Sequence, residues 1–230
     1  SGERLYFSDY NGQKIDTIRT QIEKWHQAKD ISEDVYFFLL CSLLESADKL
    51  ANTASVYGAY LKKLKKSAQK ELHLEPADFE VTENSHEVYQ IDANELISCI
   101  EGDILYLDPP YNQRQYGANY HLLNTIAEYK PFIPKGKTGL RPYEKSLYCN
   151  SRKVKGEFEN LIKKAQFKYI FLSYNNEGLM TVDDVKFIMQ KYGHYDMLEK
   201  NYQRFKADKS ENRNHKADAT IEYLHILEKQ

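Results

Sequence analysis

DILYLDPPY, which spans residues 103–111, is the most informative segment of the sequence. Its first five residues are mostly apolar, so they predict a strand that the two consecutive prolines then end. Ligands of open α/β sheets bind just beyond the carboxyl ends of the strands. This position makes Asp108 a candidate ligand-binding residue, and a rigid turn built by Pro109 and Pro110 is the simpler alternative.

Strands and helices alternate around this segment, as they do in an open α/β sheet. Further strands are predicted at residues 87–91, 168–173, 195–205 and 220–227, and helices at residues 94–100, 120–129, 157–165 and 182–191. The last two strands have no helix between them, so we expect them to pair as an antiparallel hairpin.

The residues that precede this α/β segment are predicted to be helical. Residues 11–28 place three isoleucines and a tryptophan on one helix face, and Asn11 is the expected cap. Ser32 begins a second, strongly apolar helix, and residues 53–70 predict a third, which holds five lysines and no acidic residue.

Composition narrows the classes of protein that fit. The chain has 32 Lys and Arg against 34 Asp and Glu, so a uniformly basic nucleic-acid-binding protein is excluded and anions must bind to local patches. The longest apolar run, residues 35–44, is about half the length of a membrane-spanning helix. Three widely spaced cysteines indicate neither a disulfide framework nor a zinc site, which fits a reducing cytoplasm.

Asp108-Pro109-Pro110-Tyr111 resembles the DPPY motif of the amino-methylating DNA methyltransferases, in particular the Dam-like adenine-specific class. Ile91-Asp92-Ala93 is similar to the family segment whose acid meets the adenine ring of S-adenosylmethionine. The likeness continues over most of the chain from about residue 4, through residues 32–70, 112–116, 119–121 and 172–178.

The resemblance implies a Rossmann-like α/β fold that depends on S-adenosylmethionine and carries a helical insertion. It implies two parts: residues 1–78, a helical target-recognition insertion, and residues 79–230, the carboxyl part of the catalytic domain. The implied activity is methylation of the adenine amino group in double-stranded DNA, in the cytoplasm of a bacterium with a restriction-modification system. The implied catalytic residues are Asp108, Pro109, Pro110 and Tyr111, and the implied cofactor-binding residues are Asp92, Ala93 and Asp108.

The chemistry of these residues suits that reaction. The adenine amino nitrogen is a poor nucleophile because its lone pair is delocalised into the ring. The Asp108 carboxylate and the Pro109 carbonyl can each accept one amino hydrogen. This favours a tetrahedral nitrogen whose lone pair points to the methyl donor. A base flipped out of the duplex can stack on Tyr111, and such stacking contributes about 1–3 kcal/mol.

Several other residues have two interpretations. Asp92 either contacts the cofactor or caps a helix, and Asp9 either holds a ribose or caps a helix. Tyr174 or Asn175 either touches the flipped base or stabilises its own loop. Arg114 and Gln115 are expected to contact DNA or to fill the space that the base leaves.

Residues 130–155 are the main candidate for binding DNA phosphates. They contain eight Lys or Arg, among them Lys135, Lys137 and Arg141, and a single acid, Glu144. With two glycines and three prolines, the segment is expected to be a mobile loop that orders on DNA. A solvated loop without a partner is the alternative, and the lysines of residues 62–70 have a weaker claim.

One motif of the family is absent. None of the ten glycines forms a Gly-x-Gly pair, so the sequence lacks the glycine-rich turn that the family places against the methionine end of the cofactor. We therefore expect a longer or split protein whose amino-terminal strands lie on another segment or subunit. Two other functions stay open: an inactive remnant that binds DNA, and an amino-methyltransferase that acts on RNA, protein or cytosine.

Overall fold

The DILYL sequence forms the end of a strand in a computed structural model that describes residues 4–54, 56–203 and 219–230. The sheet has the order β1-β2-β4-β3, with β1 at Glu101–Leu107, β2 at Gln166–Asn175, β4 at Ala219–Lys229 and β3 at Gly193–Gln203. Strands β1 and β2 are parallel, and β4 is antiparallel to both of its neighbours. The predicted hairpin of the last two strands is confirmed.

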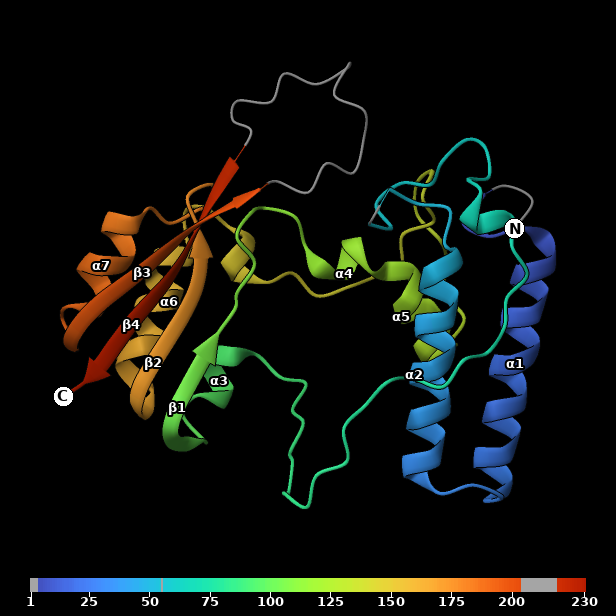
Figure 1. The fold of residues 1–230 in the computed structure, drawn as a ribbon, viewed down its shortest axis with the longest axis horizontal. Helices are drawn as coiled ribbons and strands as arrows, with labels where there is room; N and C mark the ends of the chain where they lie inside the picture. Colours follow the sequence, from blue (N-terminus) through green and yellow to red (C-terminus); the bar gives the residue numbers. More distant parts are fainter. Residues whose placement is uncertain (1–3, 55, 204–218) are drawn as a thin grey trace. The chain divides into compact units, whose positions relative to one another are not determined.

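Helices cover one face of this sheet. Figure 1 shows α6 (Val154–Lys164) and α7 (Val182–Met189) together on that face, and the short α3 (Ala93–Leu96) packs against α6. Helix α7 begins with a reciprocal capping box between Thr181 and Asp184. Helix α6 is amphipathic because every third or fourth residue is apolar, and this stripe faces the strands.

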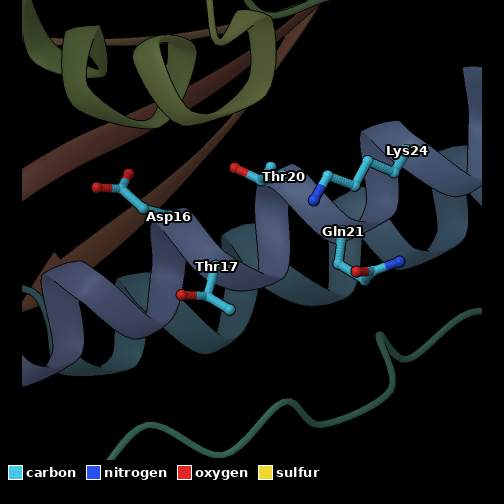
Figure 2. Close-up of a pocket in the computed structure, with 5 residues that line it drawn as sticks. All are labelled: Asp16, Thr17, Thr20, Gln21 and Lys24. Carbon is cyan, nitrogen blue, oxygen red and sulfur yellow. The ribbon is translucent and has the colours of Figure 1, made fainter.

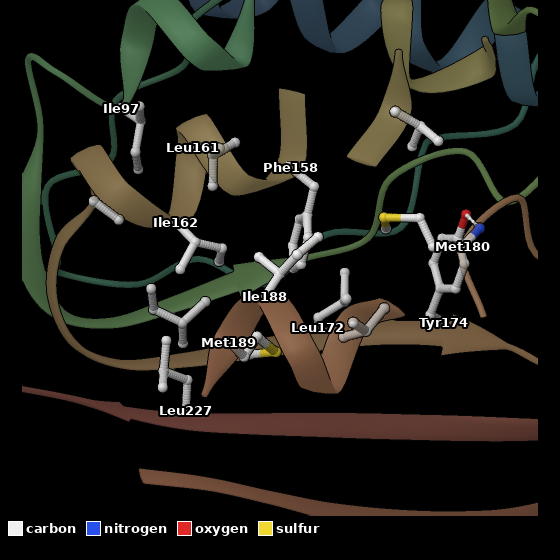
Figure 3. Packing of buried hydrophobic residues seen from close by; sticks show 14 residues of the cluster. Ile97, Phe158, Leu161, Ile162, Leu172, Tyr174, Met180, Ile188, Met189 and Leu227 are labelled. Atoms are coloured by element: carbon white, nitrogen blue, oxygen red, sulfur yellow. Dashed lines mark hydrogen bonds between the residues drawn. The ribbon is translucent and has the colours of Figure 1, made fainter. Parts of the chain in front are cut away.

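The core of this layer lies between the helices and the sheet (Figure 3). Phe158 and Ile162 of α6 meet Ile170 and Leu172 of β2, and all four side chains are fully buried. The opposite face of the sheet is less covered, since Ile104 and Tyr106 of β1 are 62% and 61% exposed. The alternation of side chains along each strand separates the two faces.

The remaining helices form a second core. These are α1 (Asp9–Ala28), α2 (Glu33–Leu50) and α5 (His121–Glu128), while the short α4 (Tyr116–Asn119) has no buried residue and a 3-10 turn lies at Ser67–Gln69. Ser32 caps α2 as predicted, through its side chain and the Val35 amide. The predicted helix at residues 11–28 is confirmed as α1, but its predicted cap was wrong, because Ser8 is the cap and Asn11 is buried. The Asn11 amide instead bonds the Lys70 carbonyl and the Leu72 amide, so it fixes a distant loop.

Two predicted elements do not form. Residues 53–70 are mostly loop, and the helix prediction for them was wrong. The buried Asn52 side chain donates to the Leu5 and Leu61 carbonyls and accepts from the Lys65 amide. These bonds satisfy backbone groups without a helix, so the segment keeps a non-helical conformation. Residues 87–91 are also not a strand; Val88 is 96% exposed and has no neighbouring strand to pair with.

The chain divides into two compact units. Unit 1 comprises Ser1–Asn84 and Tyr116–Glu144, and unit 2 comprises Ser85–Gln115 and Lys145–Gln230. The division differs from a single boundary after residue 78 because Ile126 of α5 packs with the core of α1 and α2. In the part of the chain that the structure describes, no helix has both the length and the hydropathy to cross a membrane.

Candidate active site

Strand β1 ends at Leu107, and the exposed Asp108 follows it directly. Pro109 and Pro110 are half-buried, and their rings fix two backbone torsions while restricting Asp108 as well. The carboxylate therefore lies at the carboxyl end of the strand on a stiff backbone. This is the placement that the sequence predicted.

Tyr111 turns back toward this carboxylate. Its hydroxyl donates a hydrogen bond of 2.8 Å to Asp108 Oδ1 and lies 3.1 Å from Ser173 Oγ. The parallel pairing of Leu107 with Leu172 brings Ser173 beside Asp108. Burial holds the pKa of Tyr111 well above its usual range, and the negative charge of Asp108 adds to this effect. The phenol is therefore a neutral donor at ordinary pH.

Tyr174 supports Tyr111 from below the surface. The two rings meet edge to face with centroids 5.1 Å apart, and Tyr174 is only 1% exposed. Its hydroxyl accepts from the Leu179 amide at 3.1 Å, and the Leu179 amide also donates to the Tyr111 carbonyl. A ring covered in this way does not present a face to a base, so its place in the structure is that of a support.

The turn after β2 is held by its own polar groups. Asn175 Oδ1 accepts from the Glu177 amide, and Asn176 exchanges hydrogen bonds with the backbone of Ile221. Gly178 lies against the Tyr174 ring. Of the two interpretations of this loop, the contacts of Asn175 correspond to the structural one.

Asp92 and Ala93 begin helix α3. Asp92 is the N-cap and accepts a 2.8 Å hydrogen bond from the Asn94 amide. The buried Asn94 side chain bonds Glu157 and the Tyr148 hydroxyl, so the start of α3 is tied to α6. Asp92 is exposed and only Oδ1 is used for capping, which leaves one carboxylate oxygen for a ligand. The cap and the cofactor contact are thus compatible.

Arg114 and Gln115, the two residues after the motif that were predicted to contact DNA, differ in how far their side chains are already hydrogen-bonded. Gln115 exchanges hydrogen bonds with the backbone of Ser146, at 2.8 and 3.1 Å, so its amide is occupied. The Arg114 side chain is exposed, while its carbonyl accepts from the buried Cys149 thiol. Arg114 is the more available of the two for a nucleic acid.

The basic segment contains a hydrogen-bonded turn. Lys135 and Leu140 form a β-bridge, and Gly136 and Gly139 take positive φ angles of 67° and 70°. Lys135 and Lys137 are exposed. This turn differs from the expected mobile loop because its own backbone bonds close it, and the Tyr6 hydroxyl bonds the Thr138 carbonyl.

Arg141 is the least accessible of the predicted phosphate ligands. Its guanidinium pairs with Glu128 and lies 5.6 Å from the centre of the Phe132 ring, and its side chain is 10% exposed. These contacts place Arg141 in the framework of unit 1. The sequence does not show this ion pair, because Glu128 belongs to no motif, and the phosphate contact of Arg141 stays a prediction.

Two residues that matter to the site were not predicted as functional. Ser173 was noted only as part of a resembling segment, and Gly178 only as its last residue. The sole available signal for Ser173 was its position at the end of a strand that neighbours the motif.

A shallow pocket in unit 1 contains none of the predicted site residues (Figure 2). Its volume is about 310 Å³, and it is lined by Asp16, Thr17, Thr20, Gln21 and Lys24. All five residues belong to one helix, α1. The pocket is therefore a feature of a helix surface, and its one carboxylate, Asp16, lies within a helix and not at the end of a strand.

A parallel strand that ends in a proline-stiffened carboxylate beside an aromatic ring is the arrangement expected from the resemblance to the amino-methylating enzymes. The model of the D12 class N6 adenine-specific DNA methyltransferase family matches residues 3–188. Because this match covers most of the sequence, the chain belongs to that family. The resemblance and the enzyme class predicted from the sequence are confirmed.

Named relatives agree with this assignment. Type II methyltransferase M.NlaIII of Neisseria lactamica is 66% identical over 227 residues, which are 99% of this chain and 68% of that protein. Type II methyltransferase M.FokI of Planomicrobium okeanokoites is 40% identical over 99% of this chain and 35% of its own length. Type II methyltransferase M.CviAII of Paramecium bursaria Chlorella virus 1 is 43% identical, and the chain spans 62% of it. No solved structure matches the chain.

Proposed function

We propose that these residues form part of an enzyme that methylates the exocyclic amino group of adenine in double-stranded DNA, as the modification activity of a bacterial restriction-modification system. The observation that carries the proposal is the exposed Asp108 carboxylate on a proline-stiffened strand end, with the Tyr111 phenol bonded to it. The names of the relatives, which are Type II methyltransferases, support it.

The residues act by accepting hydrogens. One amino hydrogen of the adenine bonds Asp108, and the other bonds the carbonyl of Pro109. Both acceptors pull the nitrogen lone pair out of the ring, and they bind the transition state more strongly than the flat ground state. S-adenosylmethionine, when bound, would supply the methyl group from its sulfonium, which becomes a thioether, and the methylated nitrogen would release one of its hydrogens as a proton. Pro110 and Tyr111 keep the two acceptors in place, and the half-buried Tyr111 ring gives the flipped base an apolar neighbour.

The residues present fit only one part of an S-adenosylmethionine site. Asp92, at the start of α3 with Ala93, has an unused carboxylate oxygen, and Asp108 lies exposed at the end of β1. The sequence has no Gly-x-Gly turn for the methionine end. We assign that part of the site to residues that precede or accompany these in the complete enzyme, on a missing amino-terminal segment or subunit.

The same reasoning extends to the fold. We infer that the four strands are the carboxyl part of a larger Rossmann-like sheet and that residues 1–78 belong to the target-recognition insertion. Strand β1 is at the edge of the sheet, and its Ile104 and Tyr106 side chains are exposed. Further strands would pair with the free edge of β1, and the helices that connect such strands would cover the exposed face. The greater length of the relatives leaves room for them.

For DNA contacts, we assign Lys135 and Lys137 to phosphates and Arg114 to the strand near the target base, because all three side chains are exposed. Gln115, with its amide occupied by Ser146, fixes the segment that carries Arg114. Arg141 is largely buried, so we assign it to stabilising the turn. Tyr174 is fully buried, so we assign it to holding the Tyr111 ring in place.

The proposal is tested in the full-length enzyme with labelled methyl donor and duplex DNA, followed by nucleoside analysis. Asp108→Ala should lower transfer to adenine by at least about 100-fold, the usual effect of losing a preorganised electrostatic contact. Asp103→Ala, at an exposed position on the same strand, is the matched control. Transfer that persists in Asp108→Ala, or label found on cytosine, on RNA or on protein instead of adenine, would contradict the proposal.

A further inference from the structure

Three oxygen atoms from two strand ends form a chain at the candidate active site. Asp108 Oδ1 lies 2.8 Å from Tyr111 Oη, which in turn lies 3.1 Å from Ser173 Oγ. Asp108 follows β1, and Ser173 lies in β2. The chain therefore bridges two elements that are about sixty residues apart in the sequence, 62 between Tyr111 and Ser173.

The number of hydrogens fixes the direction of these bonds. A phenol has one hydrogen, and an ionised carboxylate can only accept. Since Tyr111 gives its hydrogen to Asp108, the Ser173 hydroxyl must donate to Tyr111. Consecutive hydrogen bonds polarise one another, so donation from Ser173 makes the Tyr111 hydroxyl a better donor to Asp108.

The geometry points to Ser173 as a positioning residue for the methyl-transfer reaction. The inference rests on the proposed function. Ser173 holds the phenol of Tyr111 against Oδ1 of Asp108, and this fixes the rotation of the carboxylate. Among the residues that the structure describes, no protein donor bonds Asp108 Oδ2, so this oxygen is left for the amino group of the base.

Tyr111 needs the hydroxyl of Ser173 because its other contacts do not fix the phenol oxygen. The edge of the Tyr174 ring and the Leu179 amide hold the Tyr111 ring and backbone. Neither of them touches Oη. Without Ser173, the phenol would still be packed, but its oxygen would lose the donor on the side away from Asp108.

The test uses the full-length enzyme and measures kcat, KM for DNA and thermal unfolding. Ser173→Ala should lower kcat about tenfold, the effect of losing one hydrogen bond, with KM for DNA changed by less than about twofold. Ser173→Thr keeps the hydroxyl and should restore kcat. Ser98→Ala, an exposed serine between α3 and β1, is the matched control. Should Ser173→Ala unfold, Ser173→Cys fills the volume with a weaker donor and takes its place.

A double-mutant cycle separates positioning from a merely structural role. In a Tyr111→Phe background, Ser173→Ala should change kcat by less than about twofold, because Ser173 acts only through the phenol oxygen. A full tenfold loss in that background, or wild-type kcat in Ser173→Ala alone, would overturn the inference. Activity retained by Asp108→Ala would instead overturn the proposed function, so the two failures are distinguishable.

Discussion

Gly178 lies so close to Tyr174 that a Cβ atom at residue 178 would be 2.1 Å from Cε1 of the Tyr174 ring. No side chain fits there unless the ring moves. Because the Tyr174 ring supports Tyr111, which bonds Asp108, the glycine is coupled to the candidate active site through one ring contact and one hydrogen bond.

Gly178→Ala should therefore displace Tyr174 and destabilise the protein by about 1–3 kcal/mol, the usual effect of overpacking a filled core. It should also lower methyl transfer. Chemical unfolding and the methylation assay check both effects. Gly156→Ala is the control, because nothing lies within 4 Å of that position and it is inside helix α6. That change should stabilise by about 0.5–1 kcal/mol; equal stability of the two variants would contradict the proposed coupling.

The buried His225 predicts a loss of stability in acid. Burial lowers its pKa to about 4, while an unfolded histidine has a pKa of about 6.5. The unfolded state therefore takes up a proton first as the pH falls, and the stability that neutral His225 contributes is lost between about pH 6.5 and pH 4. At pH 5 the loss should be about 2 kcal/mol relative to pH 8.

Urea unfolding at both pH values measures this loss. His225→Leu fills the same place in the core with an apolar side chain that does not titrate. The stability of this variant should therefore fall less between pH 8 and pH 5 than that of the wild-type protein. If the wild-type protein and His225→Leu lose the same stability, His225 is not the group responsible.

Lys229 predicts a local effect on helix α6. Its ammonium group donates to the carbonyls of Ile162 at 2.8 Å and Lys163 at 3.0 Å, at the carboxyl end of the helix. A cation there satisfies free carbonyls and the helix dipole, so Lys229→Met should destabilise by about 1–2 kcal/mol. Lys191→Met, which removes an exposed ion pair with Glu159, should change stability by less than about 1 kcal/mol. Thermal or urea unfolding of both variants checks the difference, and a larger effect at Lys191 would refute it.

The exposed turn of unit 1 predicts a salt-dependent effect on DNA affinity. Neutralising Lys135 and Lys137 together, as Lys135→Gln and Lys137→Gln, should weaken binding to all sequences alike. The slope of log affinity against log salt should become less steep by about two. Titrations of the full-length enzyme at several salt concentrations measure this slope, with Lys168→Gln on strand β2 as the control. A loss confined to one sequence would assign base recognition to this turn.

The elements that sequence analysis predicted well are those whose signal is local. The DILYL strand, the capped helix after Ser32 and the final hairpin each follow from periodicity, a cap or the absence of an intervening helix. The motif also placed Asp108 at the end of that strand, where the structure has it, while the catalytic roles of Asp108 and Tyr111 stay predictions. These features depend on residues that are close together in the chain, so the sequence pattern contains the residues that cause the structure.

The helix predicted at residues 53–70 failed because of side-chain bonds that the local pattern does not show. Residues 53–70 have helical spacing, but the bonds of Asn52 to Leu5, Leu61 and Lys65 give them another path. The sequence also does not show that Arg141 pairs with Glu128 or that Tyr174 packs against Gly178 and Tyr111, and the DNA contacts of Arg141 and Tyr174 stay predictions. Charge and composition show which residue types are present, but not which side chains are already paired.

The link from Ser173 through Tyr111 to Asp108 has a consequence for protein engineering. A tetrapeptide transplanted into a foreign scaffold would bring the carboxylate and the phenol but leave the hydroxyl behind. A working graft needs two adjacent parallel strands in the register that sets Leu107 opposite Leu172. The smallest portable unit of this chemistry is thus a pair of strand ends, not a loop.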